Sequence, residues 1–401
     1  MAVSEGSAVR LLHTSDWHLG RSFHGHDLLA AQAEAMDRLV ELSREAAVEL
    51  VVIAGDLYDR AIPPAEAVRL FTDTVARLRS NGAAVVAIAG NHDSHVRVSV
   101  YDELLSALEV TIRGRWQRSD QPVLVSPRSG GGPVAIYPLP YLEPLLDGPG
   151  LQQDTEQPLT SQRLRHPEVT ELALNRIRAD LARRPGSRSV LVAHAFVAGG
   201  SSSESERELS VGHAEAVPVA MFGGFHYVAL GHLHRSQQLD GPRLAYSGTP
   251  LPYSFSEESH VKSVRLVELA ADGTPSVEVV PLGVGRPLRS LSGDLEKLLQ
   301  DPELAAAEQA WVRAELTDPL LPQQAMARLR QRFPHVVELR HRRPEGEALS
   351  SSARSQRIRA ARSPEQRLLA FFADQQGRPP LPAEEQLLRQ ALAAAGRTGE
   401  R

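Results

Sequence analysis

Apolar residues in this chain gather in short runs, and five of these runs end on side chains that can bind a metal ion. Each run is as long as a buried strand and too short for a helix. The runs with their polar endings are Leu11–His18, Val51–Asp56, Val85–Asp93, Val190–His194 and Tyr227–His234. Because open α/β sheets build their sites just past the carboxyl ends of their strands, the five endings predict one shared site.

Helical patterns separate several of these runs. Apolar residues recur three and four positions apart over Leu28–Leu50, and Pro64–Asn81 is a second helical stretch with an Asn-Gly stop. The pattern of Tyr101–Val110 predicts a third helix. Strands that alternate with helices indicate a layered α/β domain, which we assign to residues 1–283.

A smaller unit is predicted after Gly283-Val284-Gly285. It has strand patterns at Leu288–Leu291, Trp311–Leu316 and His335–Leu339, and helical patterns at Leu295–Leu299 and Gln323–Arg332. We expect a small α/β domain, called the capping domain here, over residues 284–343. Residues 344–363 are polar and rich in arginine and serine without apolar periodicity, which predicts a linker.

Residues 364–401 predict two short amphipathic helices behind this linker. Their apolar positions are Leu368, Leu369, Phe371 and Phe372 in Pro364–Ala373, and Leu387, Leu388 and Leu392 in Ala383–Ala395. Two helices of this length cannot bury much apolar area by themselves. They either fold back on the body or dock on a partner, and the linker favours a partner.

The composition of the 401 residues is that of a globular protein, with 42% apolar residues and no cysteine. The lack of cysteine excludes disulfides and thiolate metal sites. Met1–Arg10 has no apolar core of a signal peptide, and no apolar run reaches the ~20 residues of a membrane span. We therefore expect a cytoplasmic protein that does not enter a membrane.

The net charge of −5 does not by itself indicate a nucleic-acid binder. Nearly all basic residues are arginine, and lysine occurs only at Lys262 and Lys297. Neither lysine lies in the Gly-Lys-Ser/Thr sequence of a phosphate-binding P-loop. If ATP drives this protein, another chain has to hydrolyse it.

The polar endings of the five runs offer seven possible metal ligands, namely Asp16, His18, Asp56, Asn91, His194, His232 and His234. Ligands two positions apart face the same side of an extended strand end. Gly55 lets the chain turn sharply at Asp56, whose carboxylate can bridge two cations. Oxygen and imidazole ligands without sulfur suit Mn²⁺, Fe or Zn²⁺. Two such cations could clamp a phosphodiester and activate a water for attack on phosphorus.

The five motifs resemble the signatures of the calcineurin-like metallophosphoesterases. They are Asp16-x-His18, Gly55-Asp56, Gly90-Asn91-His92-Asp93, His194 and Gly231-His232-x-His234. The resemblance implies a layered β-sandwich flanked by helices and a centre of two divalent metal ions. It implies Asp16, His18, Asp56 and His234 on one ion, and Asp56, Asn91, His194 and His232 on the other. His92 matches the histidine of the family that acts on the substrate, where it would protonate the leaving oxygen.

Four longer stretches resemble the SbcD family, the nuclease subunits of bacterial SbcCD complexes. They are Thr14–Gly20, Gly90–Ser94, Ser205–Gly212 and Ser247–Phe255. This resemblance implies hydrolysis of DNA phosphodiester bonds with two Mn²⁺, as an exonuclease on double-stranded ends and as an endonuclease on single strands and hairpins. It implies a homodimer within a heterotetramer with an SbcC-type ATPase, in DNA repair and recombination. The C-terminal helices are our candidates for docking that ATPase, and the arginines between Arg328 and Arg362 are a candidate for contacts to DNA.

Two positions depart from the SbcD pattern. His226 stands where relatives usually carry aspartate, and Asp59 stands where archaeal relatives carry a second histidine on the substrate side. Neither is a predicted ligand. We expect Asp59 and Asp93 to orient neighbouring histidines, and His13 to be a packed residue of its strand.

Two other functions fit the same scaffold. A stand-alone metallophosphatase or cyclic-nucleotide phosphodiesterase would have an identical metal site, but Ser205–Gly212, the capping domain and the C-terminal helices argue against it. A non-catalytic scaffold would keep the fold and lose the chemistry, but the complete ligand set and His92 argue against that interpretation.

Overall fold

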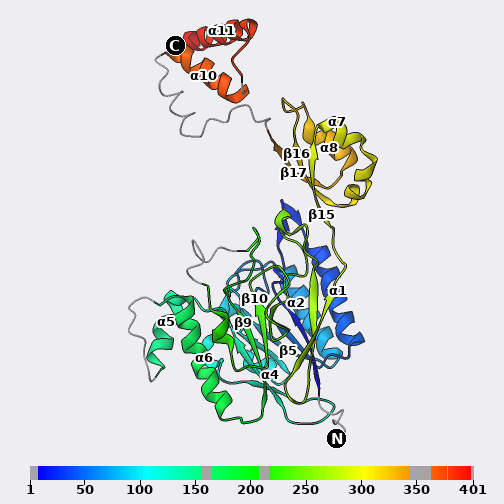
Figure 1. Cartoon of the computed structure of the whole chain (residues 1–401), viewed down its shortest axis with the longest axis vertical. Helices are drawn as coiled ribbons and strands as arrows, with labels where there is room; N and C mark the ends of the chain where they lie inside the picture. The colour runs from blue at the N-terminus through cyan, green and yellow to red at the C-terminus, as the bar shows by residue number, and fades with distance from the viewer. Residues whose placement is uncertain are drawn as a thin grey trace. The chain divides into compact units, whose positions relative to one another are not determined.

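Two six-stranded sheets form the core of the computed structural model (Figure 1). The structure describes residues 8–100, 102–155, 164–206, 216–342, 363–376 and 378–398. The chain falls into two units, residues 1–289 and residues 290–401, and both large sheets belong to the first.

The first sheet has the strand order β14-β13-β1-β4-β5-β6. Its strands are β1 (Val9–Thr14), β4 (Leu50–Ile53), β5 (Ala84–Ile88), β6 (Val110–Arg113), β13 (Ser263–Leu269) and β14 (Pro275–Pro281). The strands from β1 to β6 are parallel, and β13 and β14 extend the sheet antiparallel beyond β1. The carboxyl ends of β1, β4 and β5 therefore lie side by side at one edge.

The second sheet has the order β11-β12-β10-β9-β8-β7. Its strands are β7 (Val123–Val125), β8 (Val134–Leu139), β9 (Arg188–His194), β10 (Tyr227–Gly231), β11 (Gln237–Asp240) and β12 (Leu244–Tyr246). The central strands β8, β9, β10 and β12 are parallel, with antiparallel strands at both edges. Gly231 at the end of β10 pairs with His194 at the end of β9.

Alternate residues of these strands build two separate cores. One face of each sheet contributes to the core between the sheets, where Val52 and Val86 join Val190 and Val192. The opposite face of the second sheet, including Leu191, packs against helical residues in another core. Because both faces of the central strands are covered, the strands consist of continuous apolar runs and do not alternate with polar residues.

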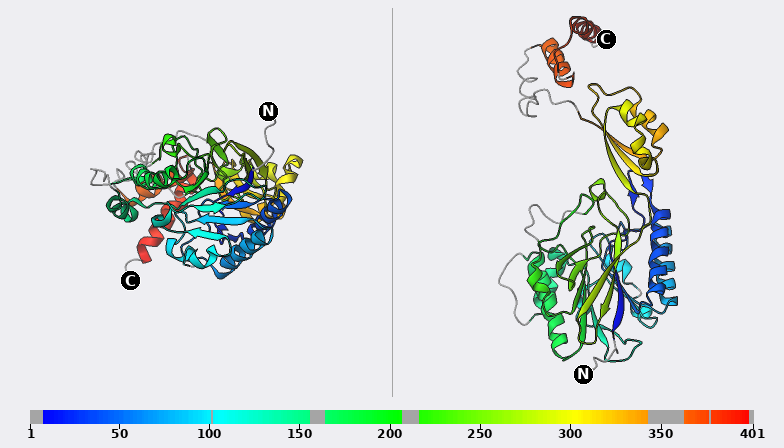
Figure 2. Two further views of the ribbon diagram at one scale, coloured as in Figure 1. Left: turned by 90° about the horizontal axis from the view of Figure 1, so that it is seen from below. Right: turned by 45° about the vertical axis from the view of Figure 1, so that its right-hand side comes forward.

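Helices cover the outer faces of the two sheets (Figures 1 and 2). The long helices are α1 (Leu29–Glu45), α2 (Ala65–Ser80), α5 (Pro144–Gln153) and α6 (His166–Ala182). The pair α1 and α2 lies on one side of the sandwich, and the pair α5 and α6 lies on the other. The predicted fold class, a layered sandwich flanked by helices, is confirmed.

The helix predicted over Tyr101–Val110 is mostly wrong. Tyr101 lies outside the described residues, a short helix α4 spans only Asp102–Ser106, and Val110 already begins β6. Glu109 has φ 56° in the left-handed region, which ends the helical path. The β-branched residues that follow form the edge strand of the first sheet, where Asp102 accepts a hydrogen bond from the amide of Ile112 at 2.9 Å. Pairing with β5 therefore overrides the helical pattern.

The second unit contains a three-stranded sheet, whose first strand begins two residues before the unit boundary, and a pair of helices. The sheet has the order β15-β16-β17 and consists of β15 (Leu288–Gly293), β16 (Trp311–Leu316) and β17 (Val336–His341). Helices α7 (Leu295–Gln300) and α8 (Ala325–Arg332) share a buried core with it. The helix pair is α10 (Pro364–Gln376) and α11 (Pro382–Thr398).

Residues 344–362 of the predicted linker lie outside the described residues. No helix within the described ranges combines the length and the apolar character that crossing a bilayer requires.

Candidate metal centre

The carboxyl ends of five parallel strands bring the seven predicted ligands together at one edge of the sandwich. The first sheet supplies Asp16 and His18 after β1, Asp56 after β4 and Asn91 after β5. The second sheet supplies His194 at the end of β9, and His232 and His234 after β10. Six of these residues are buried and Asn91 is half-buried. The candidate centre is therefore assembled from both sheets.

The carboxylate of Asp56 lies between histidines of the two sheets. Its Oδ2 is 3.6 Å from Nε2 of His18 and 3.6 Å from Nε2 of His194. His18 belongs to the first sheet and His194 to the second, so the same oxygen faces a ligand from each. A carboxylate in this position could contact cations held from either sheet.

The remaining ligands gather on either side of Asp56. Nε2 of His18 is 3.1 Å from Nε2 of His234, and these two residues with Asp16 form one group of atoms close enough to hold an ion. Asn91 Oδ1 is 2.9 Å from Nε2 of His194 and 3.2 Å from Nδ1 of His232. Asp16 also groups with Asp56 and His194, so the division of the ligands between two ions stays a prediction.

The electrostatics of the site fit a divalent cation. Burial, and then the neighbouring charge of Asp56, raises the pKa of Asp16 well above its usual value. Burial also lowers the pKa values of His18 and His232, which favours neutral imidazoles. Among the described residues, the buried Nδ1 of His18 has no hydrogen-bond partner. Carboxylates that repel each other beside neutral imidazoles form a donor set that a divalent ion would stabilise.

The backbone is strained where it presents the ligands. Asp16, His18 and Asp56 have φ values of 53°, 44° and 48°, in the left-handed region that residues with a side chain rarely adopt. Each such residue costs about 1–3 kcal/mol and persists only where the surroundings hold it in place. Gly55 has φ +90°, and a Cβ there would overlap with the ring of His194. The tight approach of the two sheets thus depends on glycine beside a ligand.

His92 is in neither ligand set that the resemblance implies, although one of its ring nitrogens lies close to ligand atoms of His18 and Asp59. Its backbone amide donates to Asp56 Oδ1 at 2.9 Å, and its Nδ1 lies 3.0 Å from the carbonyl oxygen of Asp59. Its ring meets the ring of His18 edge to face, with centroids 4.7 Å apart. Since Nδ1 donates to the Asp59 carbonyl, Nε2 remains as the nitrogen that can act on a substrate.

Asp59 and Asp93 play different parts, although we expected both to orient histidines. Asp59 holds His92 through its carbonyl oxygen, and its carboxylate lies 3.7 Å from Nδ1 of His18. Asp93 instead accepts hydrogen bonds from the backbone amides of Gly90, Leu57 and Tyr58 at 2.9–3.0 Å. It therefore joins the two ligand loops after β4 and β5, and burial, then the charge of Asp56, raises its pKa to about 7.

Two other histidines serve the fold. Nδ1 of His13 lies 2.9 Å from the hydroxyl of Tyr227 and Nε2 lies 3.1 Å from the carbonyl of Leu230, and burial lowers the pKa of His13 to about 3. It is the packed strand residue that the sequence predicts. His226 precedes the amino end of β10, opposite the end that carries His232, and its Nδ1 accepts from the amide of Ser189.

Ser205 and Glu257 also contact the centre, and the sequence did not predict this. The Oγ of Ser205 lies 2.5 Å from Nδ1 of His234, and Oε1 of Glu257 lies 3.5 Å from the same nitrogen. Glu257 also pairs with Lys262. The one sequence feature that could have indicated this network is Lys262, because lysine is rare in this arginine-rich chain.

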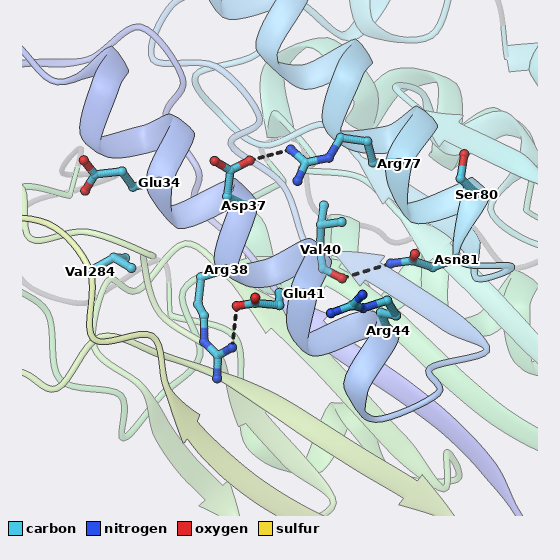
Figure 3. A pocket seen from close by; sticks show the side chains of 10 residues that line it. All are labelled: Glu34, Asp37, Arg38, Val40, Glu41, Arg44, Arg77, Ser80, Asn81 and Val284. Atoms are coloured by element: carbon cyan, nitrogen blue, oxygen red, sulfur yellow. Dashed lines mark hydrogen bonds and ion pairs between the residues drawn. The ribbon is translucent and has the colours of Figure 1, made fainter.

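A groove between α1 and α2 has no part in this centre. It has a volume of about 620 Å³ and is lined mainly by charged side chains (Figure 3). Asp37 pairs with Arg77, and Arg38 pairs with Glu41, so its charges neutralise each other. The arginines proposed for DNA contact are also partly engaged, since Arg328 pairs with Glu296 and Arg342 with Glu315.

Comparison with known proteins identifies related families over most of the chain. Residues 9–236 match the calcineurin-like phosphoesterases, and residues 284–376 match the SbcD_C family, described as the type 5 capsule protein repressor C-terminal domain. The SbcD chain of the nuclease SbcCD from Escherichia coli K12 is 30% identical over 326 residues, which are 77% of this chain and 78% of that protein. The corresponding SbcCD protein of Bacillus subtilis 168 is 30% identical over 342 residues, covering 83% and 85%.

Proposed function

Since this chain belongs to the calcineurin-like phosphoesterases and, within them, to the SbcD subunits of SbcCD nucleases, we propose that it hydrolyses DNA phosphodiester bonds as the nuclease partner of an SbcC-type ATPase. The observation that carries the proposal is the ligand set assembled from both sheets, with Asp56 between His18 and His194. We further propose that the protein works in the cytoplasm, on double-stranded ends as an exonuclease and on single strands and hairpins as an endonuclease.

Seven residues would hold two divalent ions, with Mn²⁺ as the expected metal. Asp16, His18, Asp56 and His234 would bind one ion, and Asp56, Asn91, His194 and His232 the other. When bound, the ions would neutralise charge on the phosphate oxygens and lower the pKa of a water molecule. The strained ligand loops, joined by Asp93, hold these side chains in place before any ion arrives.

His92 would protonate the 3′-oxygen that leaves the phosphorus. The hydrogen bond from Nδ1 to the Asp59 carbonyl fixes the ring, so that Nε2 of the imidazolium form carries the proton for this transfer. The hydrogen bond from the His92 amide to Asp56 keeps the ring beside the ligand that would join both ions. A positioned general acid of this kind typically contributes about 10²–10⁴-fold to the rate.

A nuclease assay tests the proposal directly. The protein, stripped with a chelator, is incubated with linear and hairpin DNA in the presence of Mn²⁺, with and without an SbcC-type ATPase and ATP. We expect cleavage that the chelator abolishes and that added Mn²⁺ restores. Hydrolysis confined to mononucleotides or cyclic nucleotides would favour the stand-alone phosphatase instead.

The helix pair α10 and α11 is the proposed docking element for the ATPase. Within the part of the pair whose side chains are described, no residue is buried, and Phe371 and Leu387 are 52% and 65% exposed. Two short helices with such open apolar positions gain stability by packing on another surface. An amphipathic helix pair suits a coiled-coil partner.

Removing residues 364–401 should abolish association with the SbcC-type ATPase and leave Mn²⁺ binding unchanged. Co-purification from cells that express both chains measures the association. Phe371→Glu with Leu387→Glu should have the same effect, whereas Leu320→Glu, at a comparably exposed position of the second unit, should not. Retention of the partner by the truncated chain would rule out this docking element.

A homodimer is the proposed assembly of this protein. An apolar hollow of about 1040 Å³ lies between α2 and the segment leading to β6, and its lining includes the exposed residues Ile62, Val100 and Leu108. Exposed apolar residues that gather at one place on the surface mark interaction sites in soluble proteins. A second copy that contributes the same apolar surface would cover it, and light scattering that gives the mass of a single chain would contradict this assignment.

A further inference from the structure

A buried polar network contacts the ring nitrogen of His234 that faces away from His18. Nε2 of His234 points toward His18 at 3.1 Å, while Nδ1 meets Ser205 Oγ at 2.5 Å and Glu257 Oε1 at 3.5 Å. Ser205 also hydrogen-bonds to Oε1 of Glu257. Ser205, Glu257 and His234 are 8%, 1% and 1% exposed, so water does not compete for these contacts. One predicted metal ligand is thus joined to segments remote from it in the sequence.

Lys262 completes the network with a matched set of donors. Its ammonium group donates to the carbonyl of His234 at 3.1 Å, to the hydroxyl of Thr249 at 2.7 Å and to Oε2 of Glu257. An ammonium has three N–H donors and each finds one acceptor here, whereas a guanidinium is a planar fork with five donors. Lysine occupies this position in a chain whose basic residues are otherwise arginine at all but one site.

The short contact between Ser205 and Glu257 sets the direction of the hydrogen bonds that reach His234, and Ser203 Oγ lies beside both at 2.9 Å and 3.3 Å. The carboxylate of Glu257, paired with Lys262, has no proton and accepts the hydroxyl proton of Ser205. Because Ser205 has a single proton, its oxygen must accept from Nδ1 of His234. The proton of the neutral imidazole is therefore on Nδ1, and the lone pair of Nε2 faces His18.

The backbone of His234 is held by the same neighbourhood. Oε1 of Glu206 accepts from the amide of His234 at 2.8 Å, and Lys262 binds its carbonyl. Protein contacts thus hold both the peptide groups and the ring of His234. A histidine held in this way loses little conformational freedom when it binds a metal.

We propose that Glu257, acting through Ser205 and held by Lys262, is a positioning residue that sets the tautomer of His234 and so prepares Nε2 as a metal ligand. This inference rests on the proposed function only in taking His234 as a ligand, and the substrate does not enter it. Residues that orient a metal-binding histidine typically contribute 10–100-fold to metal affinity.

Glu257→Gln tests the proposal. The side-chain amide of glutamine can donate a hydrogen bond to Ser205, which would reverse the direction of the hydrogen bonds from Glu257 through Ser205 to His234. Ser205 would then donate to Nδ1 of His234, which moves the ring proton to Nε2. We expect ¹⁵N chemical shifts of the metal-free protein to show Nδ1–H for His234 in the wild type and Nε2–H in the variant. Calorimetric titration with Mn²⁺ should show one of two ions bound about 10–100-fold more weakly.

Ser205→Ala offers a second route, since it removes the acceptor for Nδ1 and leaves the ion pair of Glu257 with Lys262 intact. Lys262→Met should weaken the binding of the same Mn²⁺ ion. Lys297→Met is the control and should not change Mn²⁺ affinity, because Lys297 is exposed and pairs with Asp294. Wild-type Mn²⁺ affinity and an unchanged tautomer in both Glu257→Gln and Ser205→Ala would overturn the inference. A wild-type protein that binds no Mn²⁺ would contradict the proposed function, and the tautomer measurement would still decide the inference.

Discussion

His92→Ala is expected to bind two Mn²⁺ ions as tightly as the wild type and to cleave DNA at least about a hundredfold more slowly. The side chain of His92 belongs to neither ligand set, and the hydrogen bond to Asp56 comes from its backbone amide, which alanine retains. Only the imidazole held by the Asp59 carbonyl is lost. Loss of a general acid typically costs about 10²–10⁴-fold in rate. Single-turnover cleavage of linear DNA, together with Mn²⁺ titration, separates the two effects.

His95→Ala is the matched control for this variant. His95 lies three residues further on, in the short helix α3 (His95–Val98), and its side chain is exposed. It should cleave DNA at the wild-type rate. Equal rates for His92→Ala and wild type would remove His92 from the reaction, and a parallel loss of Mn²⁺ would make it a ligand or a structural residue.

Asp56→Asn is expected to lose joint binding of the two ions and to lower the cleavage rate by at least about 10²–10³-fold, the usual loss for one electrostatic stabiliser. Asparagine keeps the shape and can accept the hydrogen bond from His92. It lacks the charged oxygen that lies 3.6 Å from both His18 and His194. An amide cannot bridge two cations as a carboxylate does.

The same variant should change stability in opposite directions with and without metal. The charge of Asp56 helps to raise the pKa values of Asp16 and Asp93, so its removal relieves repulsion in the metal-free protein. The melting temperature of the metal-free variant should therefore rise. The stabilisation that Mn²⁺ adds, about 2.7 kcal/mol at a concentration 100 times its Kd, should shrink.

Asp37→Asn serves as the control, because Asp37 is an exposed carboxylate that pairs with Arg77 on the surface of α1 and α2. It should leave both melting curves unchanged. If Asp56→Asn still gains the full stabilisation from Mn²⁺, the carboxylate does not join the ions.

The positions of the candidate ligands at one edge of the sandwich could be predicted because they depend on local signals. A run of apolar residues such as Val51–Ile53 has to be a strand buried on both faces, and the polar residue after it has to lie at the carboxyl edge. Parallel pairing of β1, β4 and β5 then aligns these edges. The strand pattern alone therefore predicts that Asp16 lies close to Asp56.

Features that depend on distant partners could not be predicted in the same way. β13 pairs with β1 although about 250 residues separate them in the chain, and nothing in either segment specifies that pairing. Val110 lies in a strand because β5 offers an edge to it, although the residues before it favour a helix. The role of Asp93 was also missed, since backbone amides from another loop leave no mark in the sequence around it.

The origin of the ligands in two sheets has a consequence for how the protein is made. A ribosome delivers the chain from its amino end, and segments can begin to fold as they emerge. The first sheet brings Asp16, His18, Asp56 and Asn91, but His194 and His234 come from the second sheet, and Lys262 is translated later still. An unfinished chain therefore lacks the complete set of side chains for two ions. The candidate centre is therefore complete only after both sheets and the segment around Lys262 have been translated.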